Sequence, residues 1–423
     1  EMTTKAQKPD RFGEQIPFCE PYWYQGHYSA YYTENHKKFR AICRKFVEEH
    51  VKPNADAWIK SPDGYPPHFH EKSYEAGIQG IIYPPEHGGT KPADFDTFYE
   101  LIMIDEFTRI GGGYIGGQAA INSMALPPIF VAGSEYIKNK VCRPVITGKK
   151  NICLAISEPF AGSDVANIKT TARREGDFYI VNGSKKWITG GTMGDFFTTA
   201  VRTGDDGMAG ISLLLLERGM PGITVRKMET QFDSAHSTTF ITLDNVKVPA
   251  VNLIGEEGQG FMLLMQNFNH ERFVIAISAC RMARLCYEEA IKFALQRETF
   301  GKRLVDHQLV RFKLAEMARQ IEALHDANER VAFQFSQGVP DYKLGGQCAL
   351  LKVHASKTFE YCAREASQIL GGNSLVKEGR GKIVERLYRE VRAQAIPGGS
   401  EEILLDFAMR QVVATASRQK ARM

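Results

Sequence analysis

Residues 152–172 read ICLAISEPFAGSDVANIKTTA, and the character of the chain changes at this stretch. Before it, from Glu34 to about Gly148, apolar residues recur mainly near the 3.6-residue period of a helix. The stretch opens with a short apolar run and continues into a Pro- and Gly-containing turn, and more short β-branched or aromatic runs follow. After Gly255 the helical period returns and continues to the end. The order of helix, strand and helix predicts three domains.

A chain of 423 residues exceeds what one hydrophobic core usually serves, which also favours several domains. We expect an α+β fold class: an N-terminal α-helical domain, a middle domain that forms a small antiparallel β-barrel or sandwich, and a C-terminal α-helical domain. An arm rich in aromatic residues and proline precedes them. The expected boundaries are 1–35 for the arm and 36–150, 151–257 and 258–423 for the domains.

Particular elements are predicted within these domains. The period predicts helices over 36–51, 97–110 and 118–132, the second of them amphipathic. Asn182-Gly183 is flanked by β-forming residues and is typical of a two-residue hairpin turn. The predicted strands are 152–157, 178–181, 196–201, 211–216, 223–227 and 240–243.

Composition excludes several classes of protein. Lys and Arg exceed Asp and Glu by only four, and they are interleaved with acids, which argues against a nucleic-acid or membrane partner. No apolar run reaches the roughly 18–20 residues of a membrane span. The eight cysteines include no CxxC pair and are expected to be small buried hydrophobic residues. His68 and His70 lack further ligands nearby, so we predict a solvated or packed pair and no metal site.

Three glycines, Gly111, Gly113 and Gly116, match the G-x-G-x-x-G pattern of dinucleotide-binding proteins. That pattern requires a preceding strand, whereas a helix is predicted here, so an interhelical turn is the better interpretation. The turn around residues 157–164 is more specific, because its successive N–H groups can hold phosphate or the electron-rich edge of a ring. Trp187 and Thr189 are two positions apart and should share one strand face.

Glu271 is the candidate general base. On a helix it shares a face with Leu264, Phe268 and Ile275, so it points along an apolar stripe. Its neighbours three and four positions away include no cation that would pair with it. Desolvation should raise its pKa, which suits a base that works near neutral pH. His270 is expected to be polar lining or core.

Four spaced motifs carry a resemblance to the acyl-CoA dehydrogenase family, from about residue 36 to the end. They are Ile156–Asp164, Trp187–Thr189, the run from Arg297 through Phe300 with Gln308, and Gln368–Gly372. The resemblance implies an FAD enzyme whose C-terminal domain is a four-helix bundle. It also implies that Leu154–Ser163, Trp187 and Thr189 surround the flavin ring, while the Arg297 and Gln368 motifs grip its ADP half across a subunit boundary. The implied assembly is a homodimer or homotetramer.

The FAD contacts implied by the resemblance are Leu154, Ile156, Ser157, Gly162, Ser163, Trp187, Ile188, Thr189, Arg297, Phe300, Gln308, Gln368, Ile369, Gly371, Gly372, Gly399, Ser400 and Glu401. The implied substrate contacts are Ser163, Asn269, His270, Arg272, Pro397 and Gly398.

The sequence departs from the commonest family pattern at Pro397, which occupies the slot of the usual catalytic glutamate. In isovaleryl-CoA and long-chain members the base instead lies in a helical Glu-Arg pair, and Glu271-Arg272 is similar in sequence and spacing. Proline also lacks the N–H that would hold the thioester carbonyl. Gly398 must offer its N–H, or the ribityl hydroxyl of the flavin must act with less help.

The implied function is FAD-dependent α,β-dehydrogenation of a fatty acyl-CoA to a trans-2-enoyl-CoA. Glu271 would take the α-proton while the β-hydride passes to flavin N5. Electrons would then leave to an electron-transfer flavoprotein or to O₂. Two alternatives stay open: an acyl-CoA oxidase that makes peroxide, and an inactive flavin-binding scaffold, some relatives of which bind DNA.

Two further expectations concern the tail of the chain and the substrate. The C-terminal Ala421-Arg422-Met423 is a close variant of the Ser-Lys-Leu address, which points to the peroxisome, with the mitochondrial matrix or cytoplasm as alternatives. The small residues of Gly111–Gly117, with Ala119 and Ala120, predict room for a long acyl tail.

Overall fold

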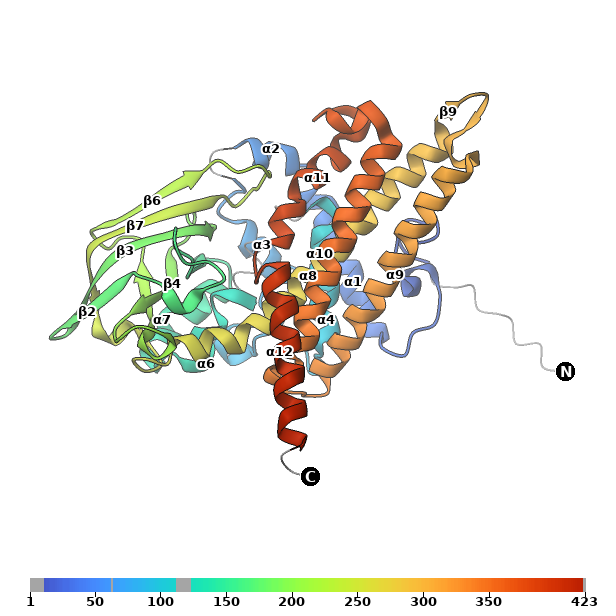
Figure 1. The fold of residues 1–423 in the computed structure, drawn as a ribbon. Coiled ribbons are helices and arrows are strands. Elements are labelled where there is room, and N and C mark those ends of the chain that lie inside the picture. The colour runs from blue at the N-terminus through green and yellow to red at the C-terminus, as the bar shows by residue number, and fades with distance from the viewer. Residues whose placement is uncertain (1–10, 62–63, 112–122, 421–423) are drawn as a thin grey trace.

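The computed structural model describes residues 11–61, 64–111 and 123–420. It contains an N-terminal helical domain, a middle β domain and a C-terminal helical domain, so the predicted fold class is confirmed (Figure 1). The β domain stands on one side of the molecule and the long C-terminal helices on the other (Figure 1). The predictions about residues 112–122 and 421–423 fall outside the described residues. In the described ranges, no helix is long and apolar enough to cross a membrane.

The first domain packs short helices around one central helix, α4 (Thr97–Phe107). This helix was predicted to be amphipathic, and that is wrong: every residue of Phe98–Phe107 is buried. α4 lies against α1, α8 and α9 and is therefore covered on all faces. The predicted helix over 118–132 is described only from residue 123, and there it forms α6. The other helices of the domain are α1 (Glu34–Phe46), continued by a π-helical turn at Val47–Val51, α2 (Ala55–Lys60), α3 (Phe69–Glu75), α6 (Pro127–Ala132) and α7 (Glu135–Ile146).

The middle domain is one twisted sheet with the strand order β6-β7-β3-β2-β4-β5-β8, and β1 pairs with β4. Most neighbours are antiparallel as predicted, but β1 and β2 both run parallel to β4. The strands are β1 (Ile152–Ala155), β2 (Thr171–Glu175), β3 (Phe178–Thr189), β4 (Phe196–Arg202), β5 (Ile211–Glu217), β6 (Ile223–Met228), β7 (Thr238–Pro249) and β8 (Leu253–Ile254).

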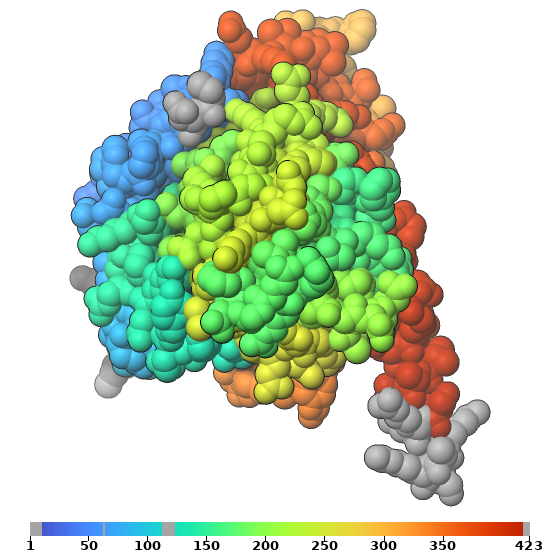
Figure 2. Space-filling view, turned by 90° about the vertical axis from the view of Figure 1, so that its left-hand side faces the viewer, coloured from blue at the N-terminus to red at the C-terminus, as the bar shows by residue number. Residues whose placement is uncertain are grey.

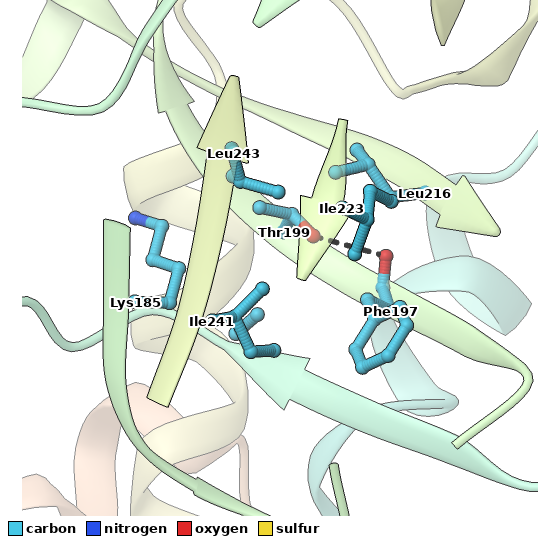
Figure 3. A pocket seen from close by; sticks show the side chains of 8 residues that line it. Lys185, Phe197, Thr199, Leu216, Ile223, Ile241 and Leu243 are labelled. Atoms are coloured by element: carbon cyan, nitrogen blue, oxygen red, sulfur yellow. Dashed lines mark hydrogen bonds between the residues drawn. The ribbon is translucent and has the colours of Figure 1, made fainter. Parts of the chain in front are cut away.

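The side chains packed inside the β domain are mostly apolar and leave no space for water. Side chains of Phe197, Leu216, Ile241 and their neighbours line a gap too narrow for a water molecule (Figure 3). Lys185 contributes its aliphatic stem to this lining, and its Nζ turns away from the apolar side chains (Figure 3). Because side chains fill the interior of the β domain, a ligand can bind only at its surface, where the loops lie.

The prediction of a hairpin turn at Asn182-Gly183 is wrong. β3 runs through this dipeptide without turning, and the register against β7 shifts between Val181 and Gly183. A β-bulge therefore takes the place of the turn, which the glycine tolerates. The hairpin lies earlier, where β2 and β3 are joined through Gly176 and Asp177.

The C-terminal domain is built on three long antiparallel helices, α8 (Gly260–Gln296), α9 (Gln308–Ser336) and α10 (Asp341–Leu370) (Figure 1). A small hairpin, β9 (Glu298–Thr299) with β10 (Lys302–Arg303), joins α8 to α9. α11 (Lys382–Ala395) and α12 (Glu401–Lys420) follow, and α12 packs on α10. Figure 2, which looks onto the β domain, shows α12 projecting beyond the body of the molecule.

A buried cluster of charges joins the arm, α4 and α8. Arg281 of α8 donates to Glu20 of the arm at 2.9 Å and is paired with Asp105 of α4. Glu20 also pairs with Arg44 at 3.0 Å and with Arg109 at 2.8 Å. The side chains of Arg281 and Glu20 are fully buried, and their opposite charges compensate each other. All eight cysteines are buried and free, as predicted.

Candidate active site

Glu271 lies on α8 with only 7% of its surface exposed. Its neighbours on the same helix face, Leu264 and Ile275, are buried as predicted. The Asn267 side-chain amide, one turn earlier, donates to Glu271 Oε1 at 2.9 Å. Asn267 also donates to the carbonyls of Ser123 and Met124, so it fixes the carboxyl against that segment. The sequence pattern places Asn267 beside Glu271 but does not predict this hydrogen bond from its side-chain amide.

Among the described residues, no cation forms an ion pair with Glu271. The adjacent Arg272 turns away, donating from Nε to Gly398 O at 3.0 Å and from Nη1 to Asn269 Oδ1 at 2.8 Å. Burial therefore dominates and raises the pKa of Glu271 to about 8, although the hydrogen bond from Asn267 and the charges of Arg272 and His270 act in the opposite direction. The predicted direction of this pKa shift is confirmed.

His270 lies beside Glu271 in sequence but faces another helix. Its Nε2 is 2.8 Å from a carboxylate oxygen of Glu100 on α4. Burial alone would lower the pKa of His270, but Glu100 outweighs it and raises the pKa to about 9. Asn269 donates to the carbonyl of Asp341 at 2.9 Å. Both residues thus have protein partners and hold α8 against α4 and α10.

The turn over residues 396–400 packs against the face of α8 that carries Glu271. Gly398 and Gly399 have φ angles of 71° and 103°, which favour glycine. A Cβ atom on Gly398 would lie 2.8 Å from Ile275 Cδ1, one helical turn beyond Glu271. The N–H groups of these two glycines donate to no group within the described ranges. Two unused donors beside a buried carboxyl can hold a carbonyl oxygen on which negative charge develops.

The loop after β1 and the end of β3 form a second group. The Lys186 N–H donates to Ser157 O at 2.8 Å, so the two motifs lie side by side. Ile188 is buried, Thr189 is half-buried and Trp187 is exposed. A bulge between Lys186 and Ile188 gives Trp187 a φ of 68°.

The buried side chain of Lys185 fixes the loop after β1, and the sequence pattern does not predict the bond from Lys185 to its partner Glu158. Its Nζ donates to Ile156 O at 3.0 Å and to Glu158 at 2.8 Å. Glu158 in turn accepts from the N–H of Lys169 at 2.6 Å and of Thr170 at 3.0 Å. The loop is thus fixed through the carbonyl of Ile156 and the side chain of Glu158.

Three hydroxyls of this group suit a polar ring such as the flavin of FAD. Those of Ser157, Ser163 and Thr189 have no hydrogen-bond partner in the described part of the chain. Gly162 has open space where a Cβ would lie, and 54% of Trp187 is exposed. Free hydroxyls, an open backbone and an accessible indole together fit a planar polar ligand. Of the remaining predicted ring contacts, Leu154 lies in β1, Ile156 directly follows β1 and Ile188 lies in β3.

The predicted ADP contacts lie elsewhere. Arg297, Phe300 and Gln308 are exposed around the β9–β10 hairpin, with Phe300 at 96%. Gln368, Gly371 and Gly372 are exposed where α10 ends, while Ile369 is buried. Figure 1 shows the β9–β10 hairpin and the end of α10 at the same end of the helical bundle, with the hairpin far from the β domain. One chain therefore does not bring its ADP contacts and its ring contacts together.

The last predicted FAD contacts begin α12. Glu401 is buried and accepts a hydrogen bond from Ser356 of α10. Ser400 and Gly399 precede it in the turn and are half-buried. These three residues directly follow Pro397 and Gly398 in the chain, and Ser356 ties Glu401 to α10.

The chain matches three family models along most of its length. They are the N-terminal domain of acyl-CoA dehydrogenase over residues 33–149, the middle domain over 153–246 and the C-terminal domain over 258–413. The acyl-CoA dehydrogenase AFT10-1 of Alternaria alternata is 38% identical over 97% of this chain and 99% of its own length.

Solved structures agree with this match. A probable acyl-CoA dehydrogenase from Mycobacterium abscessus has a TM-score of 0.84 and 35% identity, covering 90% of this chain and all of its own. An acyl-CoA dehydrogenase from Bacillus anthracis complexed with FAD has a TM-score of 0.85 and 25% identity, covering 93% of this chain and 69% of its own.

The burial of Glu271 predicts a pH-dependent cost to stability. Its pKa rises from 4.5 to about 8 on folding, so between these pH values the folded protein holds a proton that the unfolded chain has lost. The contribution of Glu271 to the free energy of unfolding therefore falls with rising pH across this window, by at most about 1.4 kcal/mol per pH unit. Glu271→Gln removes this titration. Its free energy of unfolding relative to wild type should therefore increase from pH 4.5 to about 8 and then level off.

Urea denaturation at a series of pH values measures this difference. Glu256→Gln, which alters an exposed carboxylate just before α8, is the matched control and should show no such trend. A Glu271→Gln curve that runs parallel to the wild-type curve over the whole window would show that Glu271 is not desolvated in the folded protein.

Proposed function

The chain belongs to the acyl-CoA dehydrogenase family of FAD-dependent oxidoreductases, and we propose that it converts a fatty acyl-CoA to the trans-2-enoyl-CoA with Glu271 as its base. The observation that carries this proposal is that the buried carboxyl of Glu271 forms no ion pair with a described residue and lies on the helix face against which a turn with two unused backbone N–H groups packs. Removal of a proton from carbon next to a thioester requires both a base and hydrogen-bond donors for the thioester oxygen. The carboxylate must take the α-proton, and the thioester oxygen must be stabilised as charge moves onto it.

Glu271 is suited to this proton transfer by its environment. A raised pKa of about 8 makes the carboxylate a stronger base than an exposed one, while enough of it is ionised near neutral pH. Asn267 orients the carboxyl through Oε1, which leaves Oε2 to receive the proton. His270, whose charged form is stabilised by Glu100, contributes a nearby positive charge that limits how far the pKa of Glu271 rises.

The thioester carbonyl would be held by the turn after α11. Pro397 has no N–H, so the donors available in this turn are Gly398 and Gly399. Arg272 holds the carbonyl of Gly398 and thereby fixes the peptide that carries the Gly399 N–H. Bound in this way, the acyl chain would have its α carbon next to Glu271.

The loop of Ser157–Ser163 and the residues Trp187 and Thr189 would hold the flavin ring. FAD, when bound there, supplies the acceptor for the hydride that leaves the β carbon. Exclusion of water from this region is favoured by the apolar strands behind the loop.

We further propose a homodimer or homotetramer in which the ADP contacts come from a second copy. The separation of the β9–β10 hairpin from the β domain of the same chain supports this assembly (Figure 1). So do the apolar side chains that α12 leaves exposed, which are Ile403, Leu405, Met409, Val412 and Val413.

Replacing the base tests the proposed reaction. Glu271→Gln keeps the shape and the Asn267 contact but cannot take a proton, so anaerobic bleaching of the flavin by acyl-CoA should slow by about 10²–10⁴-fold. Glu256→Gln should bleach at the wild-type rate. Pro397→Glu in the Glu271→Gln background places a carboxyl in the usual family slot and should restore part of the rate. Stopped-flow absorbance measures all three, and full activity of Glu271→Gln would place the base elsewhere.

The electron acceptor is proposed to be an electron-transfer flavoprotein. The 54% exposure of Trp187 supports this, because a protein acceptor can approach the edge of the ring site there. We expect that readmitting air to the wild-type protein bleached by acyl-CoA gives little peroxide, whereas added electron-transfer flavoprotein restores the yellow colour rapidly. Peroxide in amounts equal to the bleached flavin would instead identify an acyl-CoA oxidase.

A further inference from the structure

Lys352 on α10 is a fully buried lysine with two backbone partners far away in sequence. Its Nζ donates to the carbonyl of Ala395 and, at 2.9 Å, to the carbonyl of Gly399. Burial lowers the pKa of this lysine to about 8, against the attraction of Glu401. A buried ammonium is costly unless its donors are used, so these two bonds account for its presence.

The two carbonyls stand on either side of the turn that we assign to the thioester. α11 ends at Ala395, and the last carbonyls of a helix lack partners within that helix. Lys352 supplies one of them with a donor and reaches across to Gly399. Ile396, Pro397 and Gly398 lie between these two residues, so a single ammonium spans the segment that must present its N–H groups.

The same turn is held from two other positions. Ser356, one helical turn after Lys352, donates to Glu401 at the start of α12. Arg272 of α8 donates to Gly398 O at 3.0 Å. Side chains of α10 and α8 thus fix the carbonyl side of the turn, which leaves the N–H groups of Gly398 and Gly399 as its unused donors.

We propose that Lys352 is a positioning residue that aims these N–H groups at the thioester carbonyl, an inference that rests on the proposed function. Accurate positioning of the remaining N–H groups matters more in this chain than in one with a non-proline residue at position 397, because Pro397 removes one donor from the turn. Small errors in such geometry are costly, since the donors must meet the oxygen within hydrogen-bonding distance.

The test compares two ligands that differ only at the carbonyl carbon, which is C=O in one and CH₂ in the other. A trans-2-enoyl-CoA has the thioester carbonyl, and the corresponding trans-2-alkenyl-CoA thioether lacks it. Their affinities for the FAD-loaded protein are measured by titration of the flavin absorbance. Lys352→Met should reduce the preference for the thioester by about tenfold while binding the thioether as wild type does. A role limited to stability would weaken both ligands alike and leave the preference unchanged.

Lys343→Met, on an exposed lysine of the same helix, is the control and should keep the wild-type preference. If Lys352→Met yields no soluble holoprotein, Lys352→Gln replaces it, because it keeps N–H donors and should lose part of the preference. An unchanged preference in the folded variant overturns the role of Lys352. Wild-type flavin that no acyl-CoA bleaches would instead overturn the proposed function itself, so the two failures are distinct.

Discussion

The burial of one carboxyl without a cationic partner is the constraint on which the site depends. Glu271 could have been neutralised by the adjacent Arg272, but that guanidinium is committed to Gly398 and Asn269. Desolvation of the carboxyl consequently outweighs the opposing effects of Asn267, Arg272 and His270, and its pKa rises. Such a group destabilises the fold near neutral pH, so the surrounding helices must be held in place by other interactions.

The interactions that hold α8 lie on both sides of Glu271. Glu100 and Asp105, one turn and a half apart on α4, pair with His270 and Arg281 of α8. Glu20 of the arm adds a second carboxylate to Arg281, so residues ahead of the first helix of the core stabilise the helix that carries the base. The buried charge of Arg281 is compensated by two carboxylates, whereas the carboxyl of Glu271 forms no ion pair with a described residue. We therefore assign Arg281 to the stability of the fold and Glu271 to the reaction.

The sequence was most informative where local periodicity decides the outcome. The position of Glu271 on an apolar face, the change from helix to strand near Asn151 and the return to helix after Gly255 all follow from spacing, and the structure agrees. Two predictions failed because tertiary contacts override local signals. Asn182-Gly183 forms a bulge since β3 continues along β7, and α4 is covered on every face by helices from other parts of the chain. Lys352 could not be found, because its partner Ala395 is 43 residues away and no local pattern joins them. The roles assigned to the FAD and substrate contacts stay predictions.

The central claim is that Glu271 removes the α-proton, and a measurement that isolates this step tests it most directly. A 3-thia acyl-CoA has sulfur in place of the β carbon, so its α-protons can be removed while no β-hydride can leave. Exchange of those protons with D₂O, followed by NMR, should occur with the wild-type holoprotein and accelerate up to a pH of about 8 as Glu271 ionises. Glu271→Gln should lose this exchange while still binding the ligand. Exchange at the wild-type rate in that variant would contradict the account.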